Sequence, residues 1–465
     1  MGDSARVALA PPCPLQARYP LSHHAPDEVL AYFPDKRLTA GRFFRDALML
    51  APALTSGGHV INACHDRYLF AVSLAATLLA GKLTLMPPSF ATQAMGQLQA
   101  GYPDLRCLHD GRDWPEGIPG IRVQDHLVAN APPCDTAPLI DADRVATVMF
   151  TSGSTGEPTA HSKTWGRLCI NGAGESARLG AAGMTIVATV PAQHMYGFES
   201  SVLMALHGGA SCWHGRPFYP ADIAEALAAA PAPRMLVSTP FHLATLLEAG
   251  LKLPACDLVL SATAPLSAEL AERCEATLSA PLFEIYGCTE SGQLASRRPV
   301  HGPVWQLFPG VQMALDAQGA WVHGGHVEGR VLLSDHIEAE DADRFFLRGR
   351  NADMVNVAGK RTSLAHLNAL LLGIPGVVEG CFVQPDDEAA AGDGVIHRLA
   401  ALVVSPSVDE AALLAALRAR IDPVFLPRPL LRVDAMPRNA TGKLVRADIM
   451  ALYRERQRKL ASDNA

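Results

Sequence analysis

The spacing of apolar residues alternates between two patterns along the middle of the chain. Short apolar runs of the kind found in buried strands lie at residues 144–150, 185–190, 235–239, 258–262 and 281–286. Longer segments of helical character lie between or beside them, at residues 163–179, 221–230, 241–249 and 266–278. Strand–helix alternation implies right-handed crossovers and favours a mainly parallel sheet. We therefore predict an α/β fold.

The two ends of the chain differ from this middle part. Residues 40–85 show a weaker form of the alternation, and residues 108–140 are rich in Pro, Gly and Asp, which predicts a long surface connection. Short β-rich stretches follow Pro299, and the last part of the chain is typical of a small α+β unit. We expect a large N-terminal domain over residues 1–350, with parallel βαβ sheets and a β-rich subdomain. Residues 351–465 would form a small, mobile α+β domain.

The composition favours a large folded core and argues against several classes of protein. Hydrophobic residues make up 49% of the 465 residues and charged residues 18%, which argues against intrinsic disorder. The net charge of −7 argues against a nucleic-acid-binding protein. The 10 cysteines form no CxxC pair, as expected of reduced thiols in a cytosol. The strongest apolar stretch, between Arg67 and Lys82, is shorter than the ~20 residues of a membrane span. We expect a cytoplasmic protein.

The most informative segment is the sequence TSGSTG at residues 151–156, directly after the predicted strand at 144–150. Glycines let main-chain N–H groups converge on an anion, and Ser and Thr hydroxyls add donors. A flexible Ser/Gly linker is the alternative interpretation, although a linker seldom follows a buried strand directly. No Gly-Lys-Ser/Thr follows, which argues against a P-loop NTPase. We predict a phosphate-binding loop.

Two further segments end neighbouring predicted strands. Residues 286–290, Tyr-Gly-Cys-Thr-Glu, bring an aromatic ring, a hydroxyl and a carboxylate to the end of one strand. Residues 261–265, Ser-Ala-Thr-Ala-Pro, end the strand before it with small side chains that leave room for a flat base. Open α/β sheets bind ligands at this edge. A glutamate there can hold Mg²⁺ between phosphates, so Glu290 is a candidate metal ligand.

Further motifs occur downstream, at Asp335, Arg350 and the segment Asn-Ala-Thr-Gly-Lys that ends at Lys443. Together the motifs resemble those of the acyl-adenylate-forming superfamily, which includes acyl-CoA and aryl-CoA synthetases and stand-alone adenylation ligases. They occur in the family's order between residues 147 and 446. Taken singly, the downstream residues are equally typical of a turn cap, a surface ion pair and an exposed lysine. The resemblance implies ATP and Mg²⁺ as cofactors.

The resemblance also implies a role for each motif residue. The loop would bind the ATP phosphates, Tyr286 would pack on adenine, and Asp335 would hold the ribose with Arg350 nearby. Lys443 would offset the charge that develops when a carboxylate attacks the α-phosphate. The predicted catalytic residues are Thr289, Glu290 and Lys443. The predicted cofactor-binding residues are Thr151, Ser152, Gly153, Ser154, Thr155, Gly156, Ser261, Ala262, Thr263, Ala264, Pro265, Tyr286, Gly287, Asp335 and Arg350.

The residues of the acid pocket are predicted from the place that the acyl pocket has in the family that the chain resembles. Its candidate residues are His194, Tyr196, Ser238, Phe241 and Gln293. This mixture of polar and aromatic groups favours an aryl acid such as a hydroxybenzoate, as in secondary-metabolite pathways, over a long fatty chain. A fatty or hydroxy-fatty acyl ligase is the alternative, and a His or Tyr at such a place is equally typical of ordinary core packing.

Two departures from the family pattern concern the loop and the hinge. Residues 158–160 are Pro-Thr-Ala where the family has Pro-Lys-Gly, and Lys163 is the candidate substitute for the missing loop lysine. Ala352 stands where the family has a hinge aspartate. These departures motivate a rival hypothesis, a catalytically silent partner that binds a nucleotide or an acyl group. The presence of both Glu290 and Lys443 favours an enzyme.

The thiol acceptor and two histidine motifs complete the sequence picture. No carrier domain with an attachment serine occurs in the sequence, so we expect CoA, or the phosphopantetheine of an acyl carrier protein supplied in trans. The His23-His24-x-x-Asp27 segment imitates a condensation-domain signature with altered spacing, and we expect a loop there. His323 and His326 lack further ligands at a spacing suited to a metal.

Overall fold

The computed structural model describes residues 15–55, 57–87, 90–112, 114–152, 158–350, 354–357, 360–385, 399–438 and 444–463. The chain divides into two compact units. The first comprises Met1–Ala314 and Trp321–Val331, and the second comprises Leu315–Ala320 and Leu332–Ala465. The predicted domain boundary between residues 350 and 351 stays a prediction.

The first sheet of the first unit carries the phosphate-loop strand. Its strand order is β10 (Pro158–Thr164), β9 (Val145–Ser152), β5 (Leu83–Met86), β4 (His59–Asn62), β6 (Leu105–His109) and β7 (Gly120–Arg122). All neighbouring pairs are parallel except β10–β9, which is antiparallel. The weak alternation at residues 40–85 therefore does mark parallel βα units.

The structure refines two expectations for this sheet. Residues 108–140, expected to be a surface connection, contribute the short strand β7, which pairs with β6. The helix predicted from residue 163 begins at Trp165 in α4 (Trp165–Leu179), because residues 158–164 continue as a strand. Every second side chain of that strand becomes more buried toward its end, which is a strand pattern rather than a helical one.

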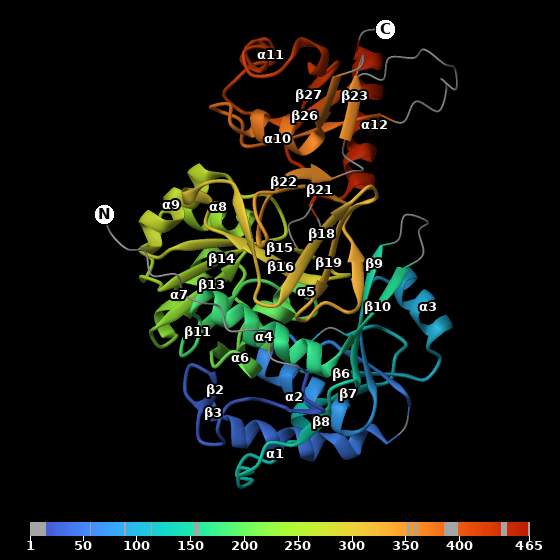
Figure 1. The fold of residues 1–465 in the computed structure, drawn as a ribbon, viewed down its shortest axis with the longest axis vertical. Helices are drawn as coiled ribbons and strands as arrows, with labels where there is room; N and C mark the ends of the chain where they lie inside the picture. The colour runs from blue at the N-terminus through green and yellow to red at the C-terminus, as the bar shows by residue number, and fades with distance from the viewer. Residues whose placement is uncertain are drawn as a thin grey trace. The chain divides into compact units, whose positions relative to one another are not determined.

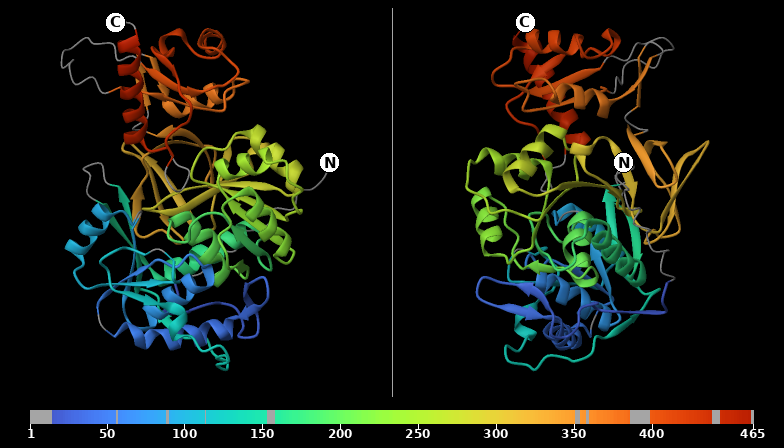
Figure 2. Two further views of the ribbon diagram at one scale, coloured as in Figure 1. Left: turned by 180° about the vertical axis from the view of Figure 1, so that it is seen from behind. Right: turned by 60° about the vertical axis from the view of Figure 1, so that its left-hand side comes forward.

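Helices α1 (Ala40–Leu50) and α2 (Arg67–Leu79) lie side by side near this sheet (Figures 1 and 2). The side chain of Asp66 caps α2 by accepting a hydrogen bond from the N–H of Leu69. The hydroxyl of Tyr68 donates to Asp46 Oδ2 at 2.7 Å, which joins the two helices in the interior. Almost all of α2 is buried, as its apolar sequence requires.

The second sheet of the first unit confirms the predicted α/β class. Within this unit its strand order is β17 (Val304–Leu307), β16 (Gly292–Arg297), β15 (Leu282–Cys288), β14 (Leu258–Ser261), β13 (Arg234–Ser238), β11 (Thr185–Ala188), β12 (Ser211–Trp213), β2 (Val29–Tyr32) and β3 (Arg37–Thr39). The strands from β15 to β2 are parallel to one another. Their carboxyl ends therefore meet at one edge, where the predicted motifs lie.

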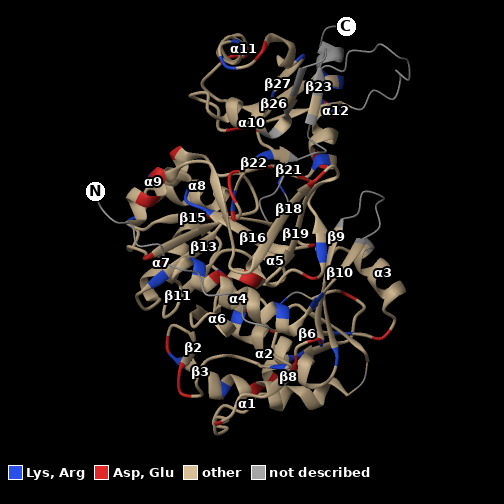
Figure 3. Ribbon diagram, in the orientation of Figure 1, with Lys and Arg blue, Asp and Glu red and all other residues tan. Residues whose placement is uncertain are grey.

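Helices α7 (Pro220–Ala229), α8 (Pro240–Glu248) and α9 (Ala268–Leu278) lie together on one side of this sheet (Figure 1). Their apolar faces share one core cluster with the buried side chains of the parallel strands. Burial of this kind supplies about 25 cal/mol per Å² of apolar surface and holds the sheet edge in place. Acidic and basic residues are interspersed along the elements of the unit (Figure 3).

A small three-stranded sheet lies where the chain passes between the units. It consists of β18 (Val311–Asp316), β19 (Gly319–Gly324) and β20 (Arg330–Leu332). The expected β-rich character after Pro299 is thus found. None of the helices in the described part of the chain is long and apolar enough to span a membrane.

The second unit contains a hairpin and a small α+β body. The hairpin is β21 (Asp335–Ala339) with β22 (Arg344–Arg350), and β23 (Met354–Val357) pairs with β24 (Lys360–Ser363). The body consists of β25 (Glu379–Val383), β26 (Ala400–Val404), β27 (Leu430–Arg432), α10 (Leu364–Leu372), α11 (Glu410–Arg418) and α12 (Arg446–Asp463). Two apolar clusters form its core. This agrees with the small α+β unit read from the sequence.

Candidate active site

The phosphate loop joins two antiparallel strands, so it closes a hairpin. Thr151 on β9 lies opposite Thr159 on β10, and Ser152 lies opposite Pro158. Gly153, Ser154, Thr155 and Gly156 fall outside the described residues. Strands β9 and β10 therefore bring the two ends of the loop together at the edge of the first sheet.

One face of β10 carries the polar groups of the site. Thr159, His161 and Lys163 alternate along the strand and so point to the same side. His161 Nε2 lies 3.1 Å from Thr151 Oγ1 and 3.8 Å from Glu290 Oε1. Burial lowers the pKa of His161, which keeps its ring neutral more readily. His161 thereby connects the phosphate-loop strand with the candidate metal carboxylate.

Lys163 lies deeper on the same face. Its residue is only 3% exposed, and its Nζ donates a hydrogen bond to the main-chain oxygen of Glu290 at 2.7 Å. Burial is the main cause that lowers the pKa of this lysine, while nearby acids such as Glu199 oppose the shift. The side chain is therefore directed at protein backbone within the first unit.

Glu290 and Thr289 stand in the tight turn between β15 and β16. Burial alone would raise the pKa of Glu290, but hydrogen bonds from its own N–H and from Cys288, with His161 and Lys163 nearby, outweigh burial and lower it. Its side chain remains 43% exposed. An ionised, accessible carboxylate beside the phosphate loop has the chemistry that Mg²⁺ prefers.

Gly287 has a steric reason to be glycine. A Cβ at this position would lie 2.4 Å from the main-chain oxygen of Gly292 on the facing strand. The pairing of β15 with β16 shifts register between Tyr286 and Gly287, which brings the two backbones close. This close approach shapes the turn that presents Glu290.

The aromatic ring of Tyr286 is buried rather than free. Tyr286 is 9% exposed, and its ring centroid lies 5.7 Å from that of Trp305 at a tilt of 58°. Arg297 covers Trp305 at 4.7 Å from the ring centroid. Trp305 and Arg297 thereby fix the orientation of the tyrosine at the sheet edge.

The segment from Ser261 to Pro265 leaves polar groups without protein partners. The hydroxyls of Ser261 and Thr263 are buried and make no hydrogen bond within the described chain. Thr263 also has φ +80°, a left-handed conformation that non-glycine residues seldom adopt. Buried hydroxyls in a strained loop next to β15 fit the binding of a nucleotide by Ser261, Ala262, Thr263, Ala264 and Pro265.

The predicted pocket residues lie at the ends of neighbouring strands. Tyr196, in the short helix α5 (Met195–Gly197) that follows β11, donates its hydroxyl to the main-chain oxygen of Ser238 at 3.1 Å. The hydroxyl of Ser238 lies 3.0 Å from that of Thr189 and is buried. His194 is held neutral, since burial and the charge of Arg216 lower its pKa to about 4. Phe241 is 41% exposed.

Arg216 was not singled out from the sequence. It follows β12, whose carboxyl end lies beside that of β11, and it influences the pKa values of His194 and His242. Burial and the nearby Arg112 lower the pKa of Arg216 itself. No hydrogen bond or ion pair joins Arg216 to another residue in the described part of the chain. An arginine three residues after the end of a strand in this sheet is the signal that could have revealed it.

Gln293 belongs to a buried polar network and is 3% exposed. Its side-chain amide donates to Glu175 Oε2 at 2.8 Å and lies 3.3 Å from the hydroxyl of Ser200. Glu199 accepts hydrogen bonds from Asn171 Nδ2 at 2.8 Å and from the N–H of Gln293 at 3.2 Å. Burial raises the pKa of Glu175 to about 7 and that of Glu199 to about 8. Neither acid was predicted, because each stands in an ordinary helical sequence.

The second unit brings two predicted residues together. Asp335 and Arg350 face each other in the register of the β21–β22 hairpin. Lys443 and the hinge residue Ala352 lie outside the described residues. Their predicted roles therefore remain predictions.

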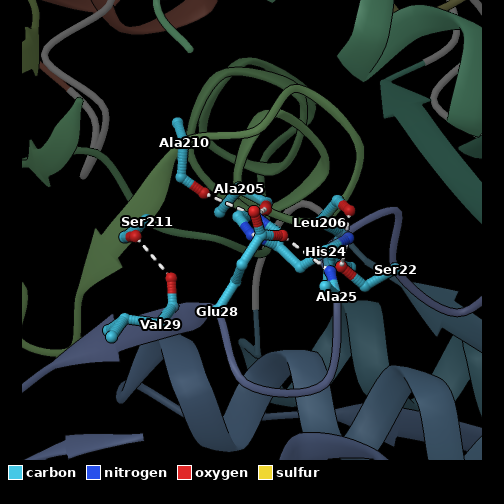
Figure 4. A network of polar contacts seen from close by, with 9 residues as sticks. All are labelled: Ser22, His24, Ala25, Glu28, Val29, Ala205, Leu206, Ala210 and Ser211. Atoms are coloured by element: carbon cyan, nitrogen blue, oxygen red, sulfur yellow. Dashed lines mark hydrogen bonds and ion pairs between the residues drawn. The ribbon is translucent and has the colours of Figure 1, made fainter. Parts of the chain in front are cut away.

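The histidine motifs have structural roles. His24 Nε2 lies 2.9 Å from the oxygen of Ala205 and 3.0 Å from that of Ala210, and its ring contacts Glu28 at 3.5 Å (Figure 4). These contacts attach the N-terminal loop to the segment before β12, as expected of a loop. His326 is buried with its Nε2 2.6 Å from the oxygen of Gln293. No group of three or more metal-ligating side chains occurs among the residues that the structure describes.

The pattern that defines the AMP-binding enzyme family matches residues 21–336. The chain belongs to this family. The members of the family that resemble this chain are AMP-forming acyl-CoA or acyl-carrier-protein ligases. The chain is therefore an adenylate-forming acid–thiol ligase.

Several characterised proteins resemble the chain. A 4-coumarate–CoA ligase of Rhodobacter capsulatus is 30% identical over 305 residues, which cover 64% of this chain and 74% of the relative. A 2-succinylbenzoate–CoA ligase of Bacillus licheniformis is 24% identical, with coverage of 90% and 96%. A fatty acid–[acyl-carrier-protein] ligase of Mycobacterium marinum is 25% identical, with coverage of 72% and 75%.

The fold likewise matches solved structures. The O-succinylbenzoate coenzyme A synthetase of Bacillus subtilis in complex with ATP and magnesium ion superposes with a TM-score of 0.75 at 19% identity. The match covers 93% of this chain and 99% of that one. The predicted family and fold class are thus confirmed.

Proposed function

We propose that this protein activates an aryl carboxylic acid, such as a hydroxybenzoate, as an acyl-adenylate and transfers it to the thiol of CoA or of a carrier-bound phosphopantetheine. The observation that carries the proposal is the position of Glu290. Its ionised carboxylate lies beside His161, which contacts Thr151 at the phosphate loop. This position supports a role for Glu290 as a metal carboxylate next to the predicted triphosphate-binding loop.

The first half-reaction joins two anions and so needs charge compensation. A carboxylate oxygen of the acid attacks the α-phosphorus of ATP, a new O–P bond forms, and the bond to the β-phosphate breaks with release of pyrophosphate. Magnesium bound by Glu290 would neutralise the departing pyrophosphate. Thr151 and the loop would orient the phosphates, and Lys443 would stabilise the charge at the α-phosphate.

The second half-reaction replaces AMP by a thiol. The sulfur attacks the acyl carbonyl carbon, a C–S bond forms, and AMP leaves with the pair of electrons from the broken C–O bond. The thiol proton goes to solvent or to a base at the site. The acceptor is CoA or an acyl carrier protein, since relatives named for both acceptors resemble the chain.

The side chains at the sheet edge support an aryl acid. His194 is neutral, and Phe241 is partly exposed. His242 has a buried Nε2 without a partner among the described residues, and its ring contacts Phe241 edge-on. Aromatic rings with a few polar groups suit a planar, substituted acid better than a long alkyl chain. Two of the named relatives act on aryl acids.

A fatty acyl substrate is the second candidate. The observation that favours it is the similarity to a fatty acid–[acyl-carrier-protein] ligase. Hydroxylamine trapping of the acyl-adenylate separates the two. With Mg-ATP, we expect hydroxamates from benzoates or cinnamates and little product from fatty acids of graded length. Efficient turnover of fatty acids alone would overturn the aryl proposal and leave the ligase assignment intact.

A further inference from the structure

The strand that follows the phosphate loop carries its basic residues at unusual places. The family lysine would stand at position 159, where this chain has Thr159. His161 and Lys163 occupy the next two positions on the same face of β10. At about 3.4 Å per residue, position 163 lies ~14 Å farther along the strand than position 159. A lysine at 163 therefore does not occupy the place of the family lysine.

The contacts of Lys163 show what it does instead. Its ammonium donates to the carbonyl oxygen of Glu290 at 2.7 Å and is almost completely buried. A buried ammonium is costly unless it is hydrogen-bonded and compensated by charge. Glu328 lies close enough to supply a compensating charge. The lysine is thus built into the interior behind the Glu290 turn.

The opposite face of the strand is attached to the same unit by a different contact. The N–H and the hydroxyl of Thr164 both donate to Glu328 Oε1 at 2.7 Å. This pair of hydrogen bonds holds the end of β10, and within the described part of the chain Thr164 makes no hydrogen bond to Glu290. Thr164 therefore attaches the end of β10 through Glu328, whereas Lys163 contacts the main chain of Glu290.

We infer that Lys163 is a positioning residue that holds the main chain at Glu290 from the phosphate-loop strand, and so sets where the metal carboxylate lies relative to the triphosphate. Lys163 would thus support the same reaction as the family lysine, but by fixing the Glu290 turn and not by contacting phosphate. The inference rests on the proposed role of Glu290 as the magnesium ligand.

The test measures pyrophosphate release against Mg²⁺ concentration at saturating ATP and acid. Lys163→Met removes the donor and keeps a side chain of similar length. We expect it to raise the Mg²⁺ concentration for half-maximal rate by about tenfold, the size of one lost buried hydrogen bond. The KM for the acid should stay unchanged. Thr164→Val is the matched control on the same strand and should leave the Mg²⁺ requirement unchanged.

A second pair of variants distinguishes positioning from phosphate contact. Thr159→Lys restores the family lysine. In combination with Lys163→Met, it should not bring the Mg²⁺ concentration for half-maximal rate back to the wild-type value. Recovery in the double variant would show that Lys163 acts as a displaced phosphate ligand and would overturn the inference. An unchanged Mg²⁺ requirement in Lys163→Met would do so as well.

Two further variants cover failure for other reasons. If Lys163→Met loses its cooperative thermal transition, Lys163→Gln takes its place, since it keeps a neutral donor. Lys163→Gln is expected to raise the Mg²⁺ concentration for half-maximal rate by less than tenfold. A wild-type value in this variant would contradict the inference. Glu290→Gln tests the proposed function separately. A wild-type Mg²⁺ requirement in that variant would show that the metal role of Glu290, not the Lys163 contact, is wrong.

Discussion

Lys163 and Glu290 are 127 residues apart in the chain, yet the lysine ammonium donates to the main-chain oxygen of the glutamate at 2.7 Å. The contact joins the edge strand of the first sheet to the β15–β16 turn of the second. It links the predicted phosphate loop and the candidate metal carboxylate through one buried side chain.

The buried acids Glu175 and Glu199 predict that stability falls at alkaline pH. Burial raises the pKa of Glu175 to about 7 and that of Glu199 to about 8. A raised pKa means that the folded state holds protons that the unfolded state has lost. The stabilising contribution is therefore complete below the unfolded pKa of about 4.5 and is lost as pH rises through the folded values.

The measurement is thermal unfolding between pH 6 and pH 9. Each group contributes a slope of up to about 1.4 kcal/mol per pH unit within its window. Glu175→Gln and Glu199→Gln imitate the protonated carboxyl, so each variant should reduce the decline of Tm toward pH 9. A variant whose Tm falls as steeply as that of the wild type would show that the acid is already ionised in the folded protein at pH 6.

Arg216 predicts selectivity for acids with a polar or anionic substituent. It stands at the sheet edge near His194 without a hydrogen bond or ion pair to another described residue. Arg216→Met should raise the KM for hydroxylated or carboxylated aryl acids by about tenfold, the effect of one hydrogen bond to a charged group. The KM for the unsubstituted acid should change little. Equal effects on both acids would show that Arg216 supports the fold and does not contact the substituent.

Replacement of Lys443 should impair acyl-adenylate formation and leave ATP binding largely unchanged. In the Lys443→Ala variant, acyl-adenylate formation should fall by about 10² or more, because the charge that develops at the α-phosphate loses its main counter-charge. ATP binding, measured by calorimetry, should change little. If the variant and the wild type form adenylate at the same rate, the lysine has no catalytic role.

Any side chain at position 287 should destabilise the β15–β16 turn, because the two strands approach closely at Gly287. A methyl group there would meet the oxygen of Gly292 at 2.4 Å, so Gly287→Ala forces the two strands apart. We expect a loss of about 1–3 kcal/mol in unfolding free energy. Gly250→Ala has open space around the new methyl group and tests the effect of a glycine change alone, although its φ of +62° adds some strain. Equal losses in both variants would contradict the steric explanation.

Much of the fold could be predicted because the relevant signals are local. The parallel strands β11, β13, β14 and β15 follow directly from short apolar runs between helical segments. The strand β10 could not be predicted in this way, because it is an edge strand with polar residues and its partner lies across the phosphate loop. Its residues resemble the start of a helix until the pairing with β9 is known.

The sequence points to candidate site residues where a motif and its chemistry coincide, as at Glu290 and Tyr286. Residues such as His161, Glu199 and Arg216 were not predictable, because their roles arise from contacts between segments far apart in the chain. The Glu199–Gln293 contact, for example, joins residues 94 positions apart. No local pattern marks such a pair.

The measurement that tests the central claim most directly is acid-dependent exchange of labelled pyrophosphate into ATP in the absence of any thiol. Exchange requires reversible formation of an acyl-adenylate and nothing further. We predict exchange that depends on Mg²⁺, is strongest with an aryl acid and is abolished in the Lys443→Ala variant. Binding of ATP without exchange across aryl and fatty acids would contradict the claim and favour a catalytically silent nucleotide-binding protein.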